Sequence, residues 1–140
     1  MKKTASAVWT GDLKQGKGIV STESGVLKDI PYSFATRFEN QTGSNPEELI
    51  GAAHAGCFSM AFSASLEKAG FTATRIATTA EVSLEKTEGG FSITAVHLIT
   101  KAEVPGIDQA QCEAIANDAK ANCPVSKLLN AKITLDITKI

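Results

Sequence analysis

The chain has 140 residues, of which 43% are hydrophobic and 21% charged, and its formal net charge is -1. These values are typical of one soluble globular domain, so we expect residues 1–140 to form a single cytoplasmic domain without the basic excess that nucleic-acid binding needs. Two lysines near the N-terminus precede no apolar segment, and no apolar run approaches the roughly 20 residues of a membrane span, so we expect neither a signal peptide nor a membrane partner.

The first third of the sequence predicts short antiparallel strands. Apolar and β-branched segments, such as residues 7–9 and 19–22, alternate with glycine-containing turns up to about Phe38. This part is polar and rich in glycine. We therefore expect its strand edges to be covered, if necessary by another chain.

The clearest helix start in the sequence follows this region. Asn45 is a favourable N-cap, Pro46 suits the first helical position, and Glu48 completes a capping-box pattern. The helix is predicted to run about 24 residues, or roughly 35 Å, and to stop near Gly70. Because it is apolar on nearly every face, we expect it to be buried on all sides.

The remaining elements complete an α+β pattern. Two strands joined by a glycine turn are predicted at 79–86 and 91–104, with a bulge near residues 93–96 where the alternation changes phase. A helix capped by Asp108 should follow, then a short helix that begins at Cys123-Pro124, and a final strand over 132–138. Strands, then helices, then strands in hairpin order indicate the α+β class.

Three cysteines carry the first chemical signal: Cys57, Cys112 and Cys123. An odd number without an export signal argues against a disulfide scaffold, leaving core residues, metal ligands or reactive thiols. Cys57 by itself reads as a small buried hydrophobe, and Cys112, on an outward face of its helix, as structural. Cys123 is predicted to be a helix N-cap, where amide groups and the positive helix end lower a thiol pKa from about 8.5.

Two charged residues and one histidine could assist a thiol. Taken alone, Arg37 is interpreted as an ordinary charge on a strand surface, and Glu47 as an acidic residue in the first turn of a helix. Together they could activate a thiolate, with the Glu fixing the planar guanidinium. His54 shares a helix face with Cys57, and these two residues together with Cys123 could supply three zinc ligands. His97 is not a convincing fourth ligand. We therefore favour a structural role for His54.

Two segments resemble the family of osmotically inducible protein C (OsmC) and the organic hydroperoxide resistance proteins. They are GSNPEELIGAAHAGCFSM at residues 43–60 and KANCPVS at residues 120–126. Each motif contains one cysteine, the order and separation fit the family, and the likeness covers essentially the whole chain. The His54-Ala55 pair favours the OsmC branch, since the other branch more often has an aromatic residue there.

The resemblance implies both a fold and a reaction. The fold would have antiparallel sheets around two long central helices in an intertwined homodimer. Cys57 would be the peroxidatic cysteine and Cys123 the resolving one, with Arg37 and Glu47 as the catalytic Arg and Glu. The protein would reduce organic hydroperoxides through a sulfenic acid and a Cys57–Cys123 disulfide, in defence against oxidative or osmotic stress, using an external dithiol and no bound cofactor or metal.

Helix geometry adds a requirement to this expectation. Glu47 and Cys57 are ten residues apart on the predicted helix, which separates them by about 15 Å along its axis. A Glu side chain cannot close that distance within one chain. We therefore predict two composite sites in each dimer, built across a two-fold axis.

Substrate preference and two other functions stay open at the level of sequence. Phe58, Met60 and Phe62 suggest an apolar pocket for bulky hydroperoxides, although they also suit ordinary core packing. A non-enzymatic protein that binds a hydrophobic ligand would keep the fold without needing Cys123. A zinc protein is the weaker alternative.

Overall fold

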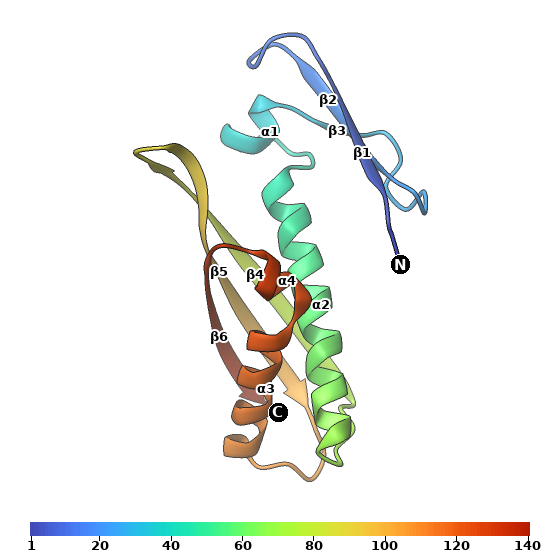
Figure 1. The fold of residues 1–140 in the computed structure, drawn as a ribbon, viewed down its shortest axis with the longest axis vertical. Helices are drawn as coiled ribbons and strands as arrows, with labels where there is room; N and C mark the ends of the chain where they lie inside the picture. The colour runs from blue at the N-terminus through green and yellow to red at the C-terminus, as the bar shows by residue number, and fades with distance from the viewer. The chain divides into compact units, whose positions relative to one another are not determined.

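The computed structural model describes residues 1–140 as an α+β chain of six strands and four helices. Contacts divide it into two compact units, Met1–Leu49 and Ile50–Ile140. Each unit has its own three-stranded sheet, and both are drawn in Figure 1. The longest helix, α2 (Pro46–Lys68), begins in the first unit and continues through the second.

The first unit is the antiparallel meander that the sequence predicts. Its strands β1 (Ala5–Thr10), β2 (Lys17–Thr22) and β3 (Ile30–Tyr32) pair in the order β1-β2-β3. The prediction was wrong for the next segment, which forms the short helix α1 (Phe34–Phe38) rather than strand. The reason is a reciprocal capping box, in which Ser33 Oγ accepts from the Thr36 N–H and Thr36 Oγ1 accepts from the Ser33 N–H.

The apolar side chains of this first sheet have little cover within their own unit. Val8 on β1 is 57% exposed, and Leu13 in the turn between β1 and β2 is 66% exposed. Trp9 and Tyr32 pack over Gly18 with ring centroids 5.5 Å apart, and a Cβ there would lie 2.3 Å from the Tyr32 ring. The unit therefore contains an aromatic cluster but contributes no residue to the buried hydrophobic core.

In the second unit, β4 (Arg75–Thr87) and β5 (Gly90–Glu103) form a long antiparallel hairpin. Their register shifts between Ser83 and Leu84, which pair with Ala95 and Ile93 and leave Thr94 as the extra residue, so the predicted bulge is confirmed. β6 (Lys132–Lys139) pairs with β5 in parallel, which corrects the expected hairpin order and makes this sheet mixed. The helices α3 (Gln109–Asn122) and α4 (Pro124–Leu128) lie between β5 and β6 in sequence and supply the crossover that a parallel pair needs.

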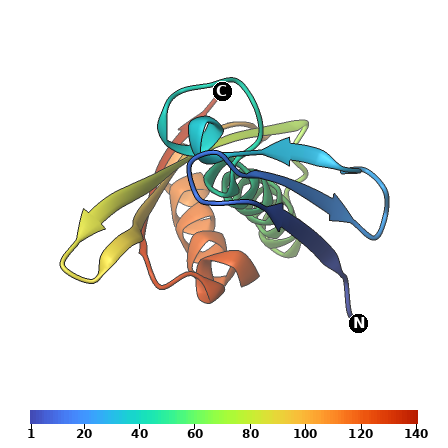
Figure 2. The ribbon, with the colours of Figure 1, turned by 90° about the horizontal axis from the view of Figure 1, so that it is seen from above.

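The core of the second unit lies between this sheet and two helices. The part of α2 in this unit and α3 run beside each other along one face of the sheet (Figures 1 and 2). Fully buried side chains come from α2, β5 and α3, among them Phe58, Phe62, Leu66, Val96, Leu98, Cys112 and Ala116. Cys112 therefore faces inward, contrary to the predicted outward face, and its structural role follows from packing.

α2 has the predicted start, but the prediction of burial on all sides was wrong. Asn45 Oδ1 accepts from the Glu48 N–H at 2.8 Å, as expected of the N-cap. The buried residues form a single stripe, Gly51, His54, Phe58, Phe62 and Leu66. Residues of the opposite face, including Ala53, Gly56 and Met60, are exposed in the single chain.

The prediction that no apolar run approaches the length of a membrane span was wrong for this helix. α2 has 23 residues, and its most apolar 18-residue window has a mean hydropathy of 1.4 with 28% of the window buried. By length and composition, one helix of the chain is therefore long and apolar enough to cross a membrane. The core helix of a soluble protein can have the same length and composition.

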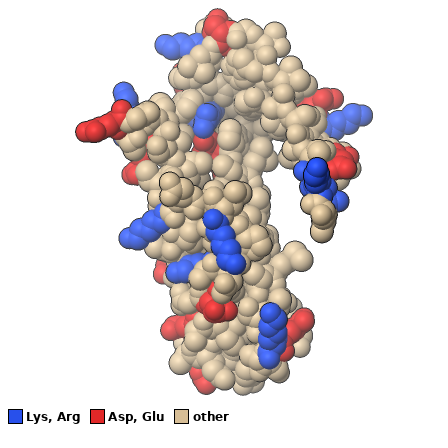
Figure 3. Space-filling view, in the orientation of Figure 1, with Lys and Arg blue, Asp and Glu red and all other residues tan.

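Charged side chains are mixed on the molecular face drawn in Figure 3. Lys and Arg alternate with Asp and Glu there, and neither sign forms a continuous patch. This distribution agrees with the formal net charge of -1. The face therefore presents no strong field of a single sign.

Candidate active site

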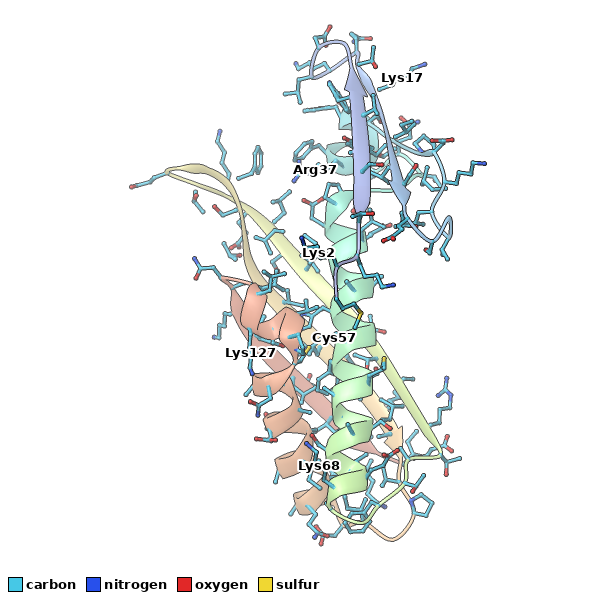
Figure 4. All side chains as sticks on the ribbon, turned by 45° about the vertical axis from the view of Figure 1, so that its right-hand side comes forward. Lys2, Lys17, Arg37, Cys57, Lys68 and Lys127 are labelled. Carbon is cyan, nitrogen blue, oxygen red and sulfur yellow. The ribbon has the colours of Figure 1, made fainter.

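The second unit brings Cys57 and Cys123 into contact. Cys57 lies on α2, and Cys123 is both the last residue of the α3 region and the residue before α4. Their Sγ atoms are 3.1 Å apart and share a hydrogen bond across 66 residues of sequence. Cys57 is labelled on α2 in Figure 4, which also marks Lys127 on the neighbouring α4. Both thiols are free, as is Cys112, which does not take part in this contact.

Accessibility distinguishes the two thiols. Cys57 is partly exposed, whereas Cys123 is 0% exposed. A small reagent from solvent therefore meets Cys57 first. Cys123 is closed to solvent and lies in direct contact with Cys57 Sγ.

The electrostatic surroundings of Cys57 in one chain favour the thiol form. Burial is the main cause that raises the pKa of Cys57, and the hydrogen bond and charge interaction with Cys123 act in the same direction. The backbone N–H of Val125 opposes them by hydrogen bonding to Cys57. Among these influences, the Val125 amide is the one that favours the Cys57 thiolate.

Cys123 does not have the environment that its sequence position predicted. It precedes Pro124 at the start of α4, but its side chain makes no capping hydrogen bond. The amide expected at its sulfur, that of Val125, instead serves Cys57. The start of α4 therefore acts on the other cysteine of the pair.

His54 is buried next to the thiols and bonds to α4. It is 0% exposed, and its Nε2 lies 2.7 Å from Ser126 Oγ. Burial lowers the pKa of His54, so the imidazole is neutral. No group of three or more His, Cys, Asp or Glu side chains is arranged to hold a metal ion, so the geometry gives the zinc alternative no support.

Arg37 and Glu47 meet within the first unit. Arg37 lies on α1, not on a strand, and Glu47 lies in the first turn of α2. Arg37 Nη2 donates to Glu47 Oε1 at 2.7 Å, and Nε donates to Oε1 and Oε2 at 3.1 and 3.2 Å. This contact uses one edge of the guanidinium, formed by Nε and Nη2, and fixes its plane, which leaves the Nη1 side to face a ligand.

An apolar cavity adjoins Arg37 in the same unit. It has a volume of about 290 Å³ and is lined by Trp9, Leu13, Tyr32, Ser33, Phe34, Arg37 and Phe38. The pocket predicted from Phe58, Met60 and Phe62 is not formed in this way, because both Phe side chains are fully buried in the core and Met60 is 77% exposed. Core packing was the correct interpretation of Phe58 and Phe62.

Three features of the site were not anticipated from sequence: the Val125 amide on Cys57, the His54–Ser126 bond and the aromatic cavity beside Arg37. The first two depend on where α4 packs, and α4 has only five residues with no amphipathic pattern of its own. The cavity had a weak signal, since Phe34 and Phe38 are spaced by one helical turn around Arg37.

Comparison with known proteins identifies the family of the chain. The family described as "OsmC-like protein" matches residues 39–138. "Peroxiredoxin OsmC" of Escherichia coli (strain K12) is 60% identical over 134 residues, covering 96% of this chain and 94% of that protein. The "Organic hydroperoxide resistance protein-like" protein of Mycoplasma pneumoniae is 31% identical, covering 87% and 85%.

A solved structure gives the same result for the fold. The crystal structure of the organic hydroperoxide resistance protein OhrB of Bacillus subtilis superposes with a TM-score of 0.75 at 29% identity, covering 96% of this chain and 98% of that one. Sequence and structure therefore agree over nearly the full length, and the chain belongs to the OsmC-like protein family.

Proposed function

We propose that this chain reduces organic hydroperoxides to alcohols, with Cys57 as the peroxidatic thiol and Cys123 as the resolving thiol. The chain is a cysteine-based peroxidase, as its 60% identity to a peroxiredoxin over nearly the whole length supports. The observation that carries the residue assignment is the 3.1 Å contact between a partly exposed and a fully buried sulfur. The role in stress defence follows from the same relatives.

The proposed reaction has three balanced steps. The Cys57 thiolate attacks one peroxide oxygen, the O–O bond breaks, and the departing alkoxide takes a proton to leave as alcohol, with Cys57 oxidised to sulfenic acid. The Cys123 sulfur then attacks Cys57 Sγ, and the hydroxyl leaves as water while the disulfide forms. An external dithiol reduces that disulfide by two thiol exchanges and is itself oxidised.

Activation of Cys57 is proposed to come from Arg37 and Glu47 of a partner subunit. Glu47 lies ten positions before Cys57 on the continuous helix α2, about 15 Å away along its axis. The Arg37–Glu47 ion pair forms within one chain, so both residues would reach the second subunit's Cys57 together. A guanidinium beside the thiolate would offset the effect of burial on its pKa.

The exposed surfaces of the single chain support a homodimer with such composite sites. The open face of α2 carries the small residues Ala52, Ala53, Gly56 and Ala64, which allow a second helix to approach closely, and the exposed apolar side chain of Met60. Apolar side chains of the first unit are also uncovered, including Val8 on β1 and Leu13 in the turn that follows. A second copy would cover both surfaces, and we propose it instead of a membrane because the other face of α2 is already packed on a sheet.

The cavity beside Arg37 supports a preference for organic over inorganic peroxide. Its lining is mainly aromatic, and its volume of about 290 Å³ suits the organic group of a hydroperoxide. Hydrogen peroxide has no such group and would gain no apolar contact there.

We also propose that the two units act as a single domain, because α2 runs through both of them.

Replacement of Cys57 by Ser tests the function directly. Wild-type protein should consume an organic hydroperoxide in the presence of a dithiol, whereas Cys57→Ser should lose this turnover and Cys112→Ser should keep it. Cys123→Ser should still perform one round of peroxide reduction, because the first attack needs only Cys57. Undiminished turnover in Cys57→Ser would exclude the peroxidase mechanism and favour a protein that only binds hydrophobic ligands.

A further inference from the structure

His54 connects the peroxidatic helix to the segment that carries the resolving cysteine. It lies three residues before Cys57 on the buried face of α2, and its Nε2 is 2.7 Å from Ser126 Oγ on α4. Apart from the thiol pair, no other hydrogen bond between side chains joins α2 to residues 123–128. The bond spans 72 residues of sequence, so it defines how these two parts of the fold meet.

Both hydrogen-bond partners of Cys57 come from the start of α4, that is, from its N-cap residue and its first turn. These are the Cys123 Sγ, at 3.1 Å, and the backbone N–H of Val125. α4 has only five residues, too few for a helix to hold its own position. Its N-cap Cys123 is tied to the end of α3, where the Cys123 N–H donates to the Ala119 carbonyl at 2.8 Å. Beyond that tie, the place of α4 depends on apolar contacts of Val125 and Leu129 with the core and on the bond to His54.

We propose that His54 is a positioning residue for the resolving step, holding the first turn of α4 so that Cys123 remains in contact with Cys57. This inference rests on the peroxidase function proposed above. After the first attack, Cys57 carries a sulfenic acid, and Cys123 must close from the 3.1 Å contact to a bond of about 2.05 Å. If the turn loosens, the sulfenic acid persists longer and a second peroxide can oxidise it to sulfinic acid.

The protonation state of His54 fits a positional role. The buried imidazole is neutral, and its Nδ1 is buried with no hydrogen-bond partner. Since an unpaired buried N–H is rarer in proteins than an unpaired acceptor, we assign the proton to Nε2, which donates to Ser126 Oγ. A neutral ring adds no positive charge beside the thiolate, so His54 acts through α4 and not through the charge of Cys57.

The test separates attack from resolution in a single turnover. Reduced protein is mixed with one equivalent of an organic hydroperoxide, quenched at intervals, and analysed by mass spectrometry for reduced Cys57, the Cys57–Cys123 disulfide and Cys57 sulfinic acid. In Ser126→Ala and His54→Leu, we expect disulfide formation to slow about tenfold, the effect of losing one buried hydrogen bond. Loss of reduced Cys57 should change less than about threefold, and sulfinic acid should increase at excess peroxide.

Two controls distinguish positioning from general destabilisation. Ser126→Thr keeps the hydroxyl and should resolve at close to the wild-type rate. Ser59→Ala removes a hydroxyl of α2 that donates to Thr78 Oγ1 at 2.8 Å on the side of the sheet. This variant should leave the rate of disulfide formation unchanged. The double variant His54→Leu/Ser126→Ala should resolve no more slowly than either single variant, because both remove the same bond.

The outcomes also separate this inference from the proposed function. Wild-type protein that forms no Cys57–Cys123 disulfide would contradict the function. If the wild-type protein forms the disulfide, and both Ser126→Ala and His54→Leu form it at the same rate, only the role of His54 would be overturned. Equal slowing in Ser59→Ala would overturn it as well, since any loosening of α2 would then have the same effect.

Discussion

Arg37 and Glu47 form a preassembled ion pair within one chain, with the guanidinium Nη2 2.7 Å from Glu47 Oε1. The pair is partly exposed, with 36% of the Arg37 side chain and 13% of the Glu47 side chain accessible. A partly exposed pair contributes little to folding, about 0–1 kcal/mol. Its fixed geometry is therefore better explained by a task that needs an oriented guanidinium.

Arg37→Lys should reduce kcat/KM for an organic hydroperoxide by about 10- to 100-fold, the range expected for lost hydrogen bonds to a charged group. Lys keeps the charge but cannot offer one edge to Glu47 and another to a thiolate or peroxide. Glu47→Gln should cause a smaller loss, because the amide still accepts one bond. Steady-state kinetics measure both. Thermal unfolding should change little, and a variant that loses activity in proportion to its stability would contradict a catalytic role for the pair.

Peroxide treatment should join Cys57 to Cys123 and leave Cys112 reduced. The first two sulfurs are 3.1 Å apart, while Cys112 is enclosed in the core by α3 and the sheet. Peptide mapping under non-reducing conditions identifies the bond. Cys112→Ser should form it at the wild-type rate, and a bond to Cys112 would show that the resolving residue is wrongly assigned.

Cys112 should matter for stability and not for turnover. Cys112→Ser places a hydroxyl at a fully buried site and should lower the free energy of unfolding by about 1–3 kcal/mol. Burial raises the pKa of Cys112 above its ordinary value of 9.0, so the folded state binds its proton more tightly than the unfolded state. The stabilisation from Cys112 is therefore complete below pH 9 and is lost as pH rises through the folded-state value. Denaturant unfolding at pH 7 and pH 10, compared with Cys112→Ala, measures both effects.

Sequence predicts the elements of this fold well where local signals are strong. Asn45 and Asp108 cap helices as expected, and the bulge at Thr94 appears in the alternation of β5. The errors have tertiary causes. The parallel pairing of β6 depends on how α3 and α4 return the chain, and the side of α3 that carries Cys112 depends on which face meets the sheet.

The candidate site shows the same division between local and tertiary information. The resemblance identified Cys57, Cys123, Arg37 and Glu47, and these form two contacts, one thiol pair and one ion pair. Their assignment to one reaction remains a proposal. Local reasoning ranked Cys123 as the more activated thiol, because it could not show that the Val125 amide serves Cys57.

The reactivity of Cys57 should depend on pH and on dimerisation together. Burial raises the pKa of Cys57 in the single chain, so its thiolate fraction, and hence its alkylation rate, should rise with pH. A guanidinium from the partner should shift this profile to lower pH in the dimer. Site-resolved alkylation of Cys57 as a function of pH, in wild-type protein and in a monomeric variant, tests this. Identical profiles would exclude activation by the partner.

Gly56→Arg should supply that monomeric variant. A Cβ atom added at Gly56 meets no atom within 4 Å in the single chain, so we expect the substitution to leave the monomer fold undisturbed and to block the approach of a second helix. We expect sedimentation to show monomers and peroxidase activity to fall at least tenfold. Gly89→Arg, at a second glycine with nothing within 4 Å, is the matched control and should remain dimeric and active. A monomeric Gly56→Arg protein with full activity would exclude composite sites.

Mixing the weakly active Arg37→Lys variant with the inactive Cys57→Ser variant should restore activity if the sites are composite. Arg37→Lys leaves Cys57 intact, and Cys57→Ser leaves Arg37 intact, so a mixed dimer would contain one site with both wild-type residues and one with neither. After denaturation and refolding of an equal mixture, half the dimers should be mixed, giving about a quarter of the wild-type activity per chain. Refolded alone, Cys57→Ser should remain inactive, and Arg37→Lys should keep only its reduced activity, well below that of the mixture. If Arg37 instead served the Cys57 of its own chain, every site in the mixture would lack one residue, and no activity would return.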